Sequence, residues 1–129
     1  MAMHVELVSP ERILYSGDAE MVICRTVSGG DVAFLADHAP FLGALEIWTV
    51  TVHTTEGDDV AAAVHGGFVH VRGNEVIVLS DVAELAGDID ADRARRAKEA
   101  AERREDGKDD AGAEAALRRA HVRLELAGR

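Results

Sequence analysis

The histidines are the first residues in this sequence to consider for chemistry. His53, His65 and His70 fall in segments rich in β-branched residues, and His4 lies near the start of the chain. Imidazole is a common zinc ligand, so two histidines on adjacent strands could begin a metal site. The alternative is that they are ordinary strand residues that face solvent. We favour the alternative and predict no metal site.

The remaining reactive side chains also have simpler explanations. Cys24 follows Val22 and Ile23, a pattern typical of a buried and unreactive thiol in a strand. Asp37 and His38 could form an acid–base dyad, but Pro40 favours a tight turn, because the residue before a proline is held extended. The sequence lacks the GxxxxGKS/T, GxGxxG, HExxH, GxSxG and CxxC motifs. The absence of these motifs argues against an enzyme, although many enzymes lack them.

The first two-thirds of the chain should be a β-sandwich or barrel. Short segments rich in β-branched residues alternate there with turn signals. Gly73-Asn74 is a two-residue hairpin signal because both residues tolerate positive φ. We expect antiparallel strands at 4–8, 13–15, 21–26, 32–35, 47–54, 60–65, 68–72 and 75–80.

One of these segments is apolar on both faces. Residues 76–79 read Val-Ile-Val-Leu, whereas an antiparallel sandwich usually leaves one face of a strand to water. The outer face could be covered by the C-terminal segment or by another subunit. It could equally belong to a central strand that lies under a loop.

After Gly87 the sequence predicts a helical hairpin. A helix is expected at 90–104, a break at 105–110 and a second helix at 111–127 that stops at Gly128. The expected seam consists of alanines 94, 97 and 101 against Ala113, Leu117, Ala120, Leu124 and Ala127. Alanine methyls bury little surface, so this hairpin should need the sandwich, a ligand or a partner to hold it. The expected domains are thus 1–87 and 88–129.

Charge is distributed unevenly between these two parts. The net charge of −10 lies in residues 1–87, which carry 13 acidic against 3 basic side chains. Such a surface repels a phosphate backbone, so no nucleic-acid partner is expected, whereas a basic protein surface would be attracted. No run of about 18 apolar residues is present, and the N-terminus does not read as a secretory signal. These features predict a cytoplasmic protein.

Four segments in order resemble the epsilon subunit of bacterial F-type ATP synthases. They are LVSPERILYSGDAEMV at 7–22, DHAPFL at 37–42, GGFVHVRGNEVIVLSDVAELAGDID at 66–90 and ALRRAHVRLELA at 116–127. The resemblance implies a ten-stranded antiparallel β-sandwich followed by two C-terminal helices. It also implies a non-catalytic central-stalk subunit of the rotor, at the cytoplasmic face of the cell membrane. Its expected partners are the gamma subunit, the c-subunit ring and the alpha/beta catalytic head, where the helices restrain ATP hydrolysis.

The resemblance also suggests which residues contact these partners. The end of the sandwich that faces the c-ring in this family corresponds here to Asp31, His38, Phe41 and Leu42. Asp31 would meet basic residues of the ring, although an aspartate there could simply cap a turn. The strand face around Phe68 and Val78 is the candidate gamma contact.

Some members of this family bind ATP as a regulatory ligand, through a motif of the form I/L-D-x-x-R-A and basic residues of the second helix. The matching residues here are Ile89, Asp90, Arg93, Ala94, Arg119 and Arg123. Asp90 could accept a hydrogen bond from adenine or ribose, while the arginines would neutralise phosphate. The alternative is that Asp90 is an N-cap and the arginines solvate a helix.

Two other functions stay open on the residues alone. One is a metal-dependent enzyme that uses the strand histidines, which metal analysis would detect. The other is a free-standing nucleotide sensor, in which the helical hairpin holds ATP.

Overall fold

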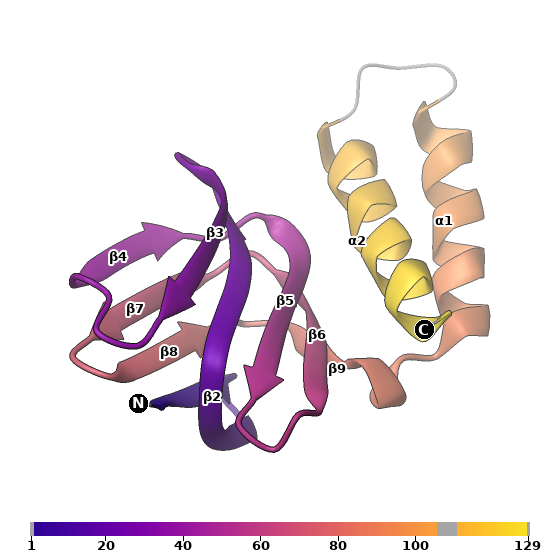
Figure 1. Cartoon of the computed structure of the whole chain (residues 1–129). Helices are drawn as coiled ribbons and strands as arrows, with labels where there is room; N and C mark the ends of the chain where they lie inside the picture. The colour runs from indigo at the N-terminus through magenta and orange to yellow at the C-terminus, as the bar shows by residue number, and fades with distance from the viewer. Residues whose placement is uncertain (1, 106–110, 129) are drawn as a thin grey trace.

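The protein is a β-sandwich followed by a helical hairpin, in a computed structural model that describes residues 2–105 and 111–128 (Figure 1). Its elements are β1 (Met3–Val8), β2 (Ile13–Thr26), β3 (Gly30–Leu35), β4 (Phe41–Ala44), β5 (Ile47–Thr54), β6 (Asp59–His65), β7 (Phe68–Arg72), β8 (Glu75–Leu79), β9 (Ala83–Leu85), the 3-10 turn η1 (Ala86–Asp88), α1 (Ala91–Glu105) and α2 (Ala111–Ala127). The predicted fold class is confirmed. The predicted break falls mostly on residues 106–110, which lie outside the described residues.

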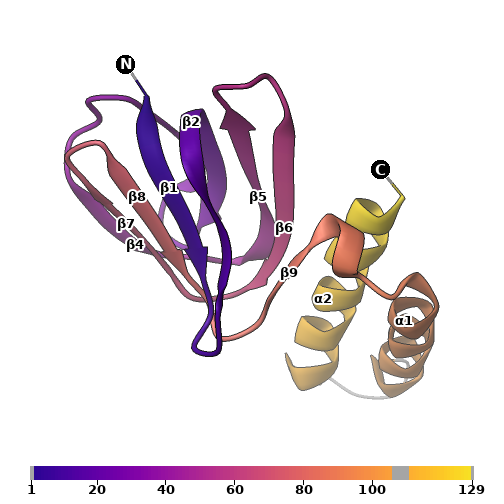
Figure 2. The ribbon, with the colours of Figure 1, turned by 90° about the horizontal axis from the view of Figure 1, so that it is seen from below.

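Strand β2 belongs to both layers of the sandwich. Its first half pairs with β1, from Ile13 to Ala19, and its second half pairs with β5 and β3. The strand order is β4-β7-β8-β1-β2-β5-β6-β9, with β3 paired to β2 outside this path. Figure 2 shows the two layers facing each other, with β4, β7, β8 and β1 on one side and β5 and β6 on the other.

The continuity of β2 differs from the sequence prediction, which placed two strands here with a gap at residues 16–20. The gap contains Gly17, and a Cβ at this glycine would lie 2.5 Å from the hydroxyl of Tyr15. The glycine thus lets the half-buried tyrosine side chain lie close over the strand, and a larger residue here would displace the end of that side chain. The glycine reads as a turn signal in sequence, although both halves of the strand are paired.

Two short strands and one strand direction were also missed. β4 contains Gly43 and β9 has three residues, so neither carries a clear alternating pattern. The pairing of β1 with β8 is parallel, with Val5 opposite Val76, so the sandwich is not wholly antiparallel as predicted. Strand direction of this kind follows from how the hairpins are stacked, which no local sequence pattern records.

The sandwich core is made of side chains from the inner faces of both layers. Valines dominate it, together with Met3, Leu7 and Phe34. In β7 and β8, the inward residues Val69, Val71, Val76 and Val78 are buried. Ile77 is half-buried and Leu79 is 48% exposed, so the outer face of β8 is partly open in the isolated chain.

Helix α2 lies between α1 and the sandwich (Figure 2). One side of it meets α1 through Ala113 and Ala120, which face the buried Ala94 and Ala101. The other side inserts Val122 and Leu126 into a small second core on β5 and β6. The second core also receives Ile47, Trp48, Ala61, Ala63, Ala86 and Ile89.

The hairpin seam is therefore lined by alanine, as predicted, but only four of its eight predicted members are fully buried. Ala97 and Ala127 are exposed, whereas Leu117 and Leu124 are half-buried. The support that the weak seam requires comes from the sandwich, through the opposite side of α2. None of the described helices is both long and apolar enough to span a membrane.

Candidate functional site

An apolar depression lies on the outer face of β7 and β8. Phe68 is 54% exposed and stands opposite Leu79 in the strand register. These two side chains border a cavity of about 390 Å³ with the start of the β1–β2 loop; the other lining residues are Val8, Ser9, Pro10, Gly67, Ser80 and Asp81. A depression with exposed apolar side chains suits contact with another protein.

Val78, which the sequence grouped with Phe68, does not lie on this face. It stands opposite Val69, and both side chains are buried in the core. Successive residues of a strand point to opposite faces, so Leu79, not Val78, shares the outer face with Phe68. Naming Val78 as a surface contact was wrong.

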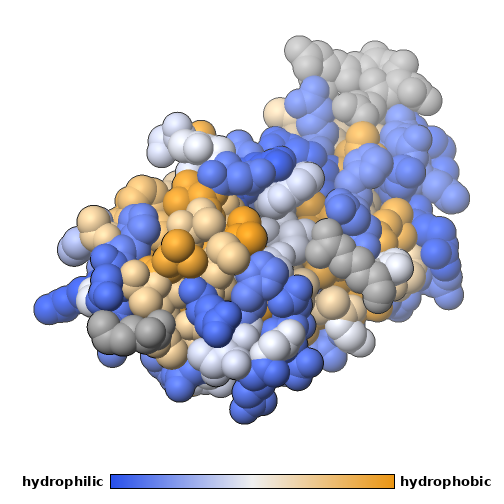
Figure 3. Space-filling view, in the orientation of Figure 1, coloured by the Kyte–Doolittle hydropathy of each residue, from blue (hydrophilic) through white to orange (hydrophobic). Residues whose placement is uncertain are grey.

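The second predicted contact surface is built around Phe34. This buried ring makes an edge contact with His38 at 4.9 Å and a tilted contact with Phe41 at 5.4 Å between ring centroids. Leu42 follows in β4 and is 68% exposed. Together with the exposed Leu35, it adds to the apolar surface over β3 and β4 in Figure 3.

The loop before β4 is held by hydrogen bonds that involve both backbone and side-chain atoms. Asp37 adopts φ of 64°, and its N–H donates to Asn74 Oδ1 at 2.8 Å. His38 Nδ1 lies 2.7 Å from Ala39 O. These contacts support the interpretation of residues 37–40 as a turn.

In the β7–β8 hairpin, Gly73 takes positive φ at 61° and Asn74 does not, so one glycine suffices where two permissive residues were expected.

Asp31 lies apart from His38, Phe41 and Leu42. It is near the start of β3, while residue 38 follows the end of that strand. It is directly opposite Arg25, whose Nε and Nη2 donate to the two carboxylate oxygens at 2.8 and 3.3 Å. The hydrogen bond from Arg25 lowers the pKa of Asp31. The guanidinium of Arg25 also stacks 3.6 Å from the centroid of the Trp48 ring. Asp31 is thus a cross-strand partner rather than a turn cap.

A polar cavity of about 430 Å³ lies where the sandwich meets the helices. Of the residues predicted for ATP, Asp90, Arg93, Ala94 and Arg123 line it. The structure adds four lining residues that the sequence did not suggest: Val82, Glu84, Asp88 and Ala97. Residues 82 and 84 come from the segment around β9, a strand with no clear sequence signature.

The other two predicted ATP residues do not line this cavity. Ile89 packs into the second core, and Arg119 is half-buried on α2. Asp90 is also the N-cap of α1, because its Oδ1 accepts a hydrogen bond from the backbone N–H of Arg93 at 3.0 Å. One oxygen of Asp90 therefore already has a structural role.

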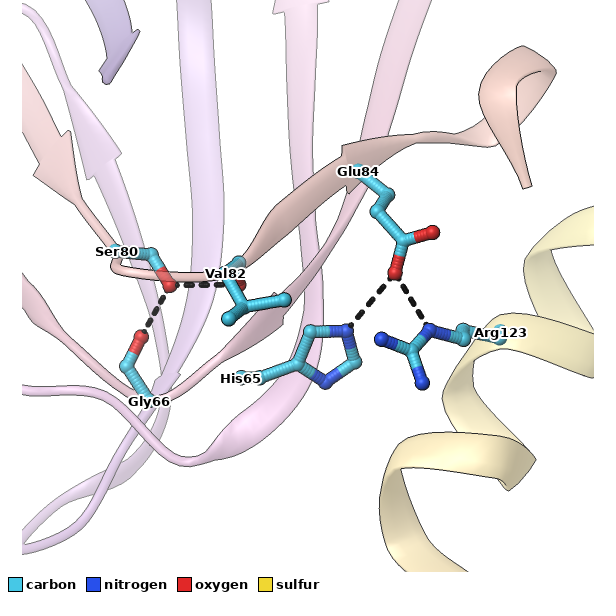
Figure 4. A network of polar contacts seen from close by, with 6 residues as sticks. All are labelled: His65, Gly66, Ser80, Val82, Glu84 and Arg123. Carbon is cyan, nitrogen blue, oxygen red and sulfur yellow. Dashed lines mark hydrogen bonds and ion pairs between the residues drawn. The ribbon is translucent and has the colours of Figure 1, made fainter. Parts of the chain in front are cut away.

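Glu84 joins the sandwich to α2 at the edge of this cavity (Figure 4). Its Oε1 accepts a hydrogen bond from Arg123 Nε at 2.5 Å and lies 3.4 Å from His65 Nε2. Nearby, Ser80 Oγ lies 2.8 Å from Gly66 O and 2.9 Å from Val82 O, which fixes the segments that carry His65 and Glu84. Burial, together with Arg123, lowers the pKa of His65 to about 4.

The histidines do not converge. His4 lies near Ser16, Glu6 and Asp18, and His53 pairs with Asp59 at 2.6 Å. Within residues 2–105 and 111–128, no group of three or more His, Cys, Asp or Glu side chains is arranged to hold a metal ion. Cys24 is buried, and burial raises the pKa of its thiol to about 11, which fits an unreactive cysteine.

Known proteins are similar to this chain in both sequence and fold. The profile of the family described as "ATP synthase, Delta/Epsilon chain, beta-sandwich domain" matches residues 2–86. The ATP synthase epsilon chain of Streptomyces griseus is 48% identical over 122 residues, which cover 95% of this chain and 92% of the relative. That of Halalkalibacterium halodurans is 42% identical over 132 residues, covering 98% of each chain.

Similar folds occur among solved structures. A chain in the cryo-EM structure of Euglena gracilis mitochondrial ATP synthase, in its OSCP/F1/c-ring assembly, has a TM-score of 0.84 at 22% identity, covering 99% of this chain and 82% of that one. A likeness at 22% identity supports the assignment of the fold, whereas the more similar bacterial relatives support the assignment of the family. The β-sandwich followed by two helices, matched along nearly its whole length, places this chain in the family of ATP synthase epsilon chains.

Proposed function

We propose that this protein is the epsilon subunit of a proton-translocating F-type ATP synthase, with a non-catalytic role in the central stalk of the rotor. The observation that carries the proposal is the 48% identity to an ATP synthase epsilon chain across 95% of this sequence. The acidic charge of residues 1–87 and the exposed apolar faces suit a body that other proteins hold. The protein would associate with the cytoplasmic face of the membrane through the complex alone.

Two faces of the sandwich are proposed for two partners. The depression around Phe68 and Leu79 would take the gamma subunit, and the surface of His38, Phe41 and Leu42 would take the c-subunit ring. Asp31 lies apart from that surface, so it would reach the ring only as a separate contact and as the Arg25–Asp31 pair, since its carboxylate already has a partner. Apolar contact would then supply more of the affinity than charge.

Reciprocal variants test this assignment. Phe68→Asp should weaken binding to purified gamma by at least about 10-fold, because it places a charge against an apolar contact, while binding to the c-ring is retained. Leu42→Asp should weaken binding to the c-ring, while binding to gamma is retained. Both positions are exposed, so both variants should fold. Equal loss of both partners in each variant, or loss of neither, would refute the two-face assignment.

The helical hairpin is proposed to regulate ATP hydrolysis by leaving the sandwich for the alpha/beta head. The seam between α1 and α2 is made of small side chains. The attachment of the hairpin to the sandwich depends mainly on Val122, Leu126 and the Glu84–Arg123 pair. A hairpin of this size is marginal in water without support. Such an attachment is weak enough to exchange for another surface.

ATP is proposed as a regulatory ligand of the cavity between η1, α1 and α2. Arg93 and Arg123 would meet the phosphates, and Oδ2 of Asp90, the oxygen that does not cap α1, would meet the base or ribose. Glu84 and Asp88 also line the cavity, and Arg123 is held by Glu84. Phosphate must compete with this carboxylate for Arg123, which argues for weak binding in the millimolar range.

Titration calorimetry of the full chain with ATP at millimolar concentration tests the ligand. Arg93→Gln should reduce affinity several-fold, because Arg93 lines the cavity. Arg96→Gln is the matched control, since Arg96 is exposed on the same helix and does not line the cavity. Absence of binding at 10 times the expected concentration, or an equal loss in both variants, would remove ATP from the proposal.

A further inference from the structure

The contact between the sandwich and α2 contains a buried histidine whose environment disfavours a charge. The side chain of His65, the last residue of β6, is only 3% exposed. In the neutral tautomer that donates from Nε2 to Glu84, Nδ1 carries a lone pair. Nδ1 is buried and has no hydrogen-bond partner among the described residues.

A second proton on this ring would be costly for two reasons. The new N–H at Nδ1 would be buried without an acceptor, and a buried polar group that lacks a hydrogen-bond partner destabilises the state that contains it. The charge would also face Arg123 and Arg119 on α2, against the single carboxylate of Glu84 on β9, which is already bound to Arg123. The docked helix therefore keeps His65 neutral.

Release of α2 would remove these constraints. It would expose His65 to water and withdraw both guanidiniums, since both belong to α2. The imidazole would then regain its ordinary pKa of 6.5, whereas the pKa in the docked state is about 4. The released state thus binds a proton more readily than the docked state.

We propose that the contact of His65 and Glu84 with Arg123 is a proton-sensitive latch, in which acidification releases α2 from the β-sandwich. The stabilisation of the docked state is fully present above pH 6.5 and is lost as the pH falls toward 4, because the docked pKa is the lower one. The docking equilibrium constant should fall about 4-fold from pH 7.5 to 6.0 and about 30-fold to pH 5.0. Its use in the ATP synthase rests on the proposed regulatory role of the hairpin.

Hydrogen exchange of the full chain between pH 7.5 and 5.0 tests the latch, after correction for the intrinsic pH dependence of exchange. A released helix of this length loses most of its protection. Protection of α2 amides should fall about 30-fold, while amides of the β1–β8 pairing keep theirs. Fluorescence of Trp48, the single tryptophan, should change in parallel because it packs against the second core.

Two matched variants identify the titrating group. His65→Gln keeps a donor for Glu84 but cannot be protonated, so its α2 protection should be independent of pH in this range. His53→Gln is the control: His53 also pairs with a carboxylate, at 2.6 Å from Asp59, but lies away from α2. In His53→Gln, the protection of α2 amides should fall with pH as it does in the wild type. A fall that persists in His65→Gln, or no fall in the wild type, would overturn the latch.

Arg119→Gln gives an independent result if His65→Gln does not fold. Arg119 helps to lower the pKa of His65, so its removal should raise the pKa of His65 in the docked state. The fall in α2 protection between pH 7.5 and 5.0 should then be smaller than in the wild type. An unchanged fall would contradict the proposal. Binding of gamma at pH 7.5 should be the same in all these variants, so failure of the latch is distinguishable from failure of the stalk-subunit assignment.

Discussion

At Gly67 the surrounding backbone leaves no room for a side chain. Gly67 has φ of 115°, and a Cβ added there would lie 2.0 Å from the carbonyl oxygen of Leu79. No side chain can be accommodated without moving β8. The close approach is what brings Phe68 beside Leu79 on the proposed gamma face.

Gly67→Ala should therefore destabilise the sandwich by at least about 3 kcal/mol, because it adds a backbone clash to an unfavourable φ. Gly57→Ala is the control. Gly57 also has positive φ, at 95°, but nothing lies within 4 Å of its added Cβ, so about 1 kcal/mol is expected. Urea unfolding of both variants gives the comparison. Equal costs would show that the clash is relieved by a small movement.

Residues whose role is local were predicted more successfully than residues whose role depends on register. The N-cap role of Asp90, which the sequence offered as the alternative to ATP binding, is present in the structure, and recognising an N-cap requires only the next three residues. The pairing of Asp31 with Arg25 was missed, since it depends on the alignment of β2 with β3. Val78 was placed on the wrong face for a related reason: in a segment apolar on both faces, the sequence does not show which face is inside.

Among the elements, α2 connects the two parts of the molecule. Its alanine side was predicted from the seam of Ala113, Leu117, Ala120, Leu124 and Ala127, whose members alternate four and three residues apart, and its second side of Val122 and Leu126 was not. Periodicity shows one apolar seam clearly, whereas two buried residues on the opposite side resemble ordinary variation. The acidic partner in the cavity was missed as well, because Glu84 lies in a three-residue strand.

Leu126→Ala should weaken docking of α2 on β5 and β6 by about 2–5 kcal/mol, since Leu126 is fully buried in the second core. The variant should lose α2 protection in hydrogen exchange at pH 7.5 and keep the sandwich folded. His121→Ala serves as the control, because His121 is exposed on the same helix. Simultaneous unfolding of α2 and the sandwich in Leu126→Ala would mean that the two parts do not separate.

At the scale of the whole molecule, the two parts differ in how they are held together. The sandwich has a continuous core that involves both layers, whereas the hairpin has an alanine seam and one small contact with the sandwich. The sequence shows this contrast directly, in the change near Gly87 from β-branched to alanine-rich segments. Which side of the hairpin meets the sandwich required the structure, since it depends on contacts between residues far apart in the chain.

The most direct test of the account is to tag this chain in its own cells, solubilise the membranes with a mild detergent and identify what is purified with the tag. An assembled ATP synthase should be recovered, with the gamma subunit and the c-ring in fixed proportion to the tagged chain. Recovery of the tagged chain alone, while the ATP synthase of the same cells purifies with a different epsilon chain, would contradict it.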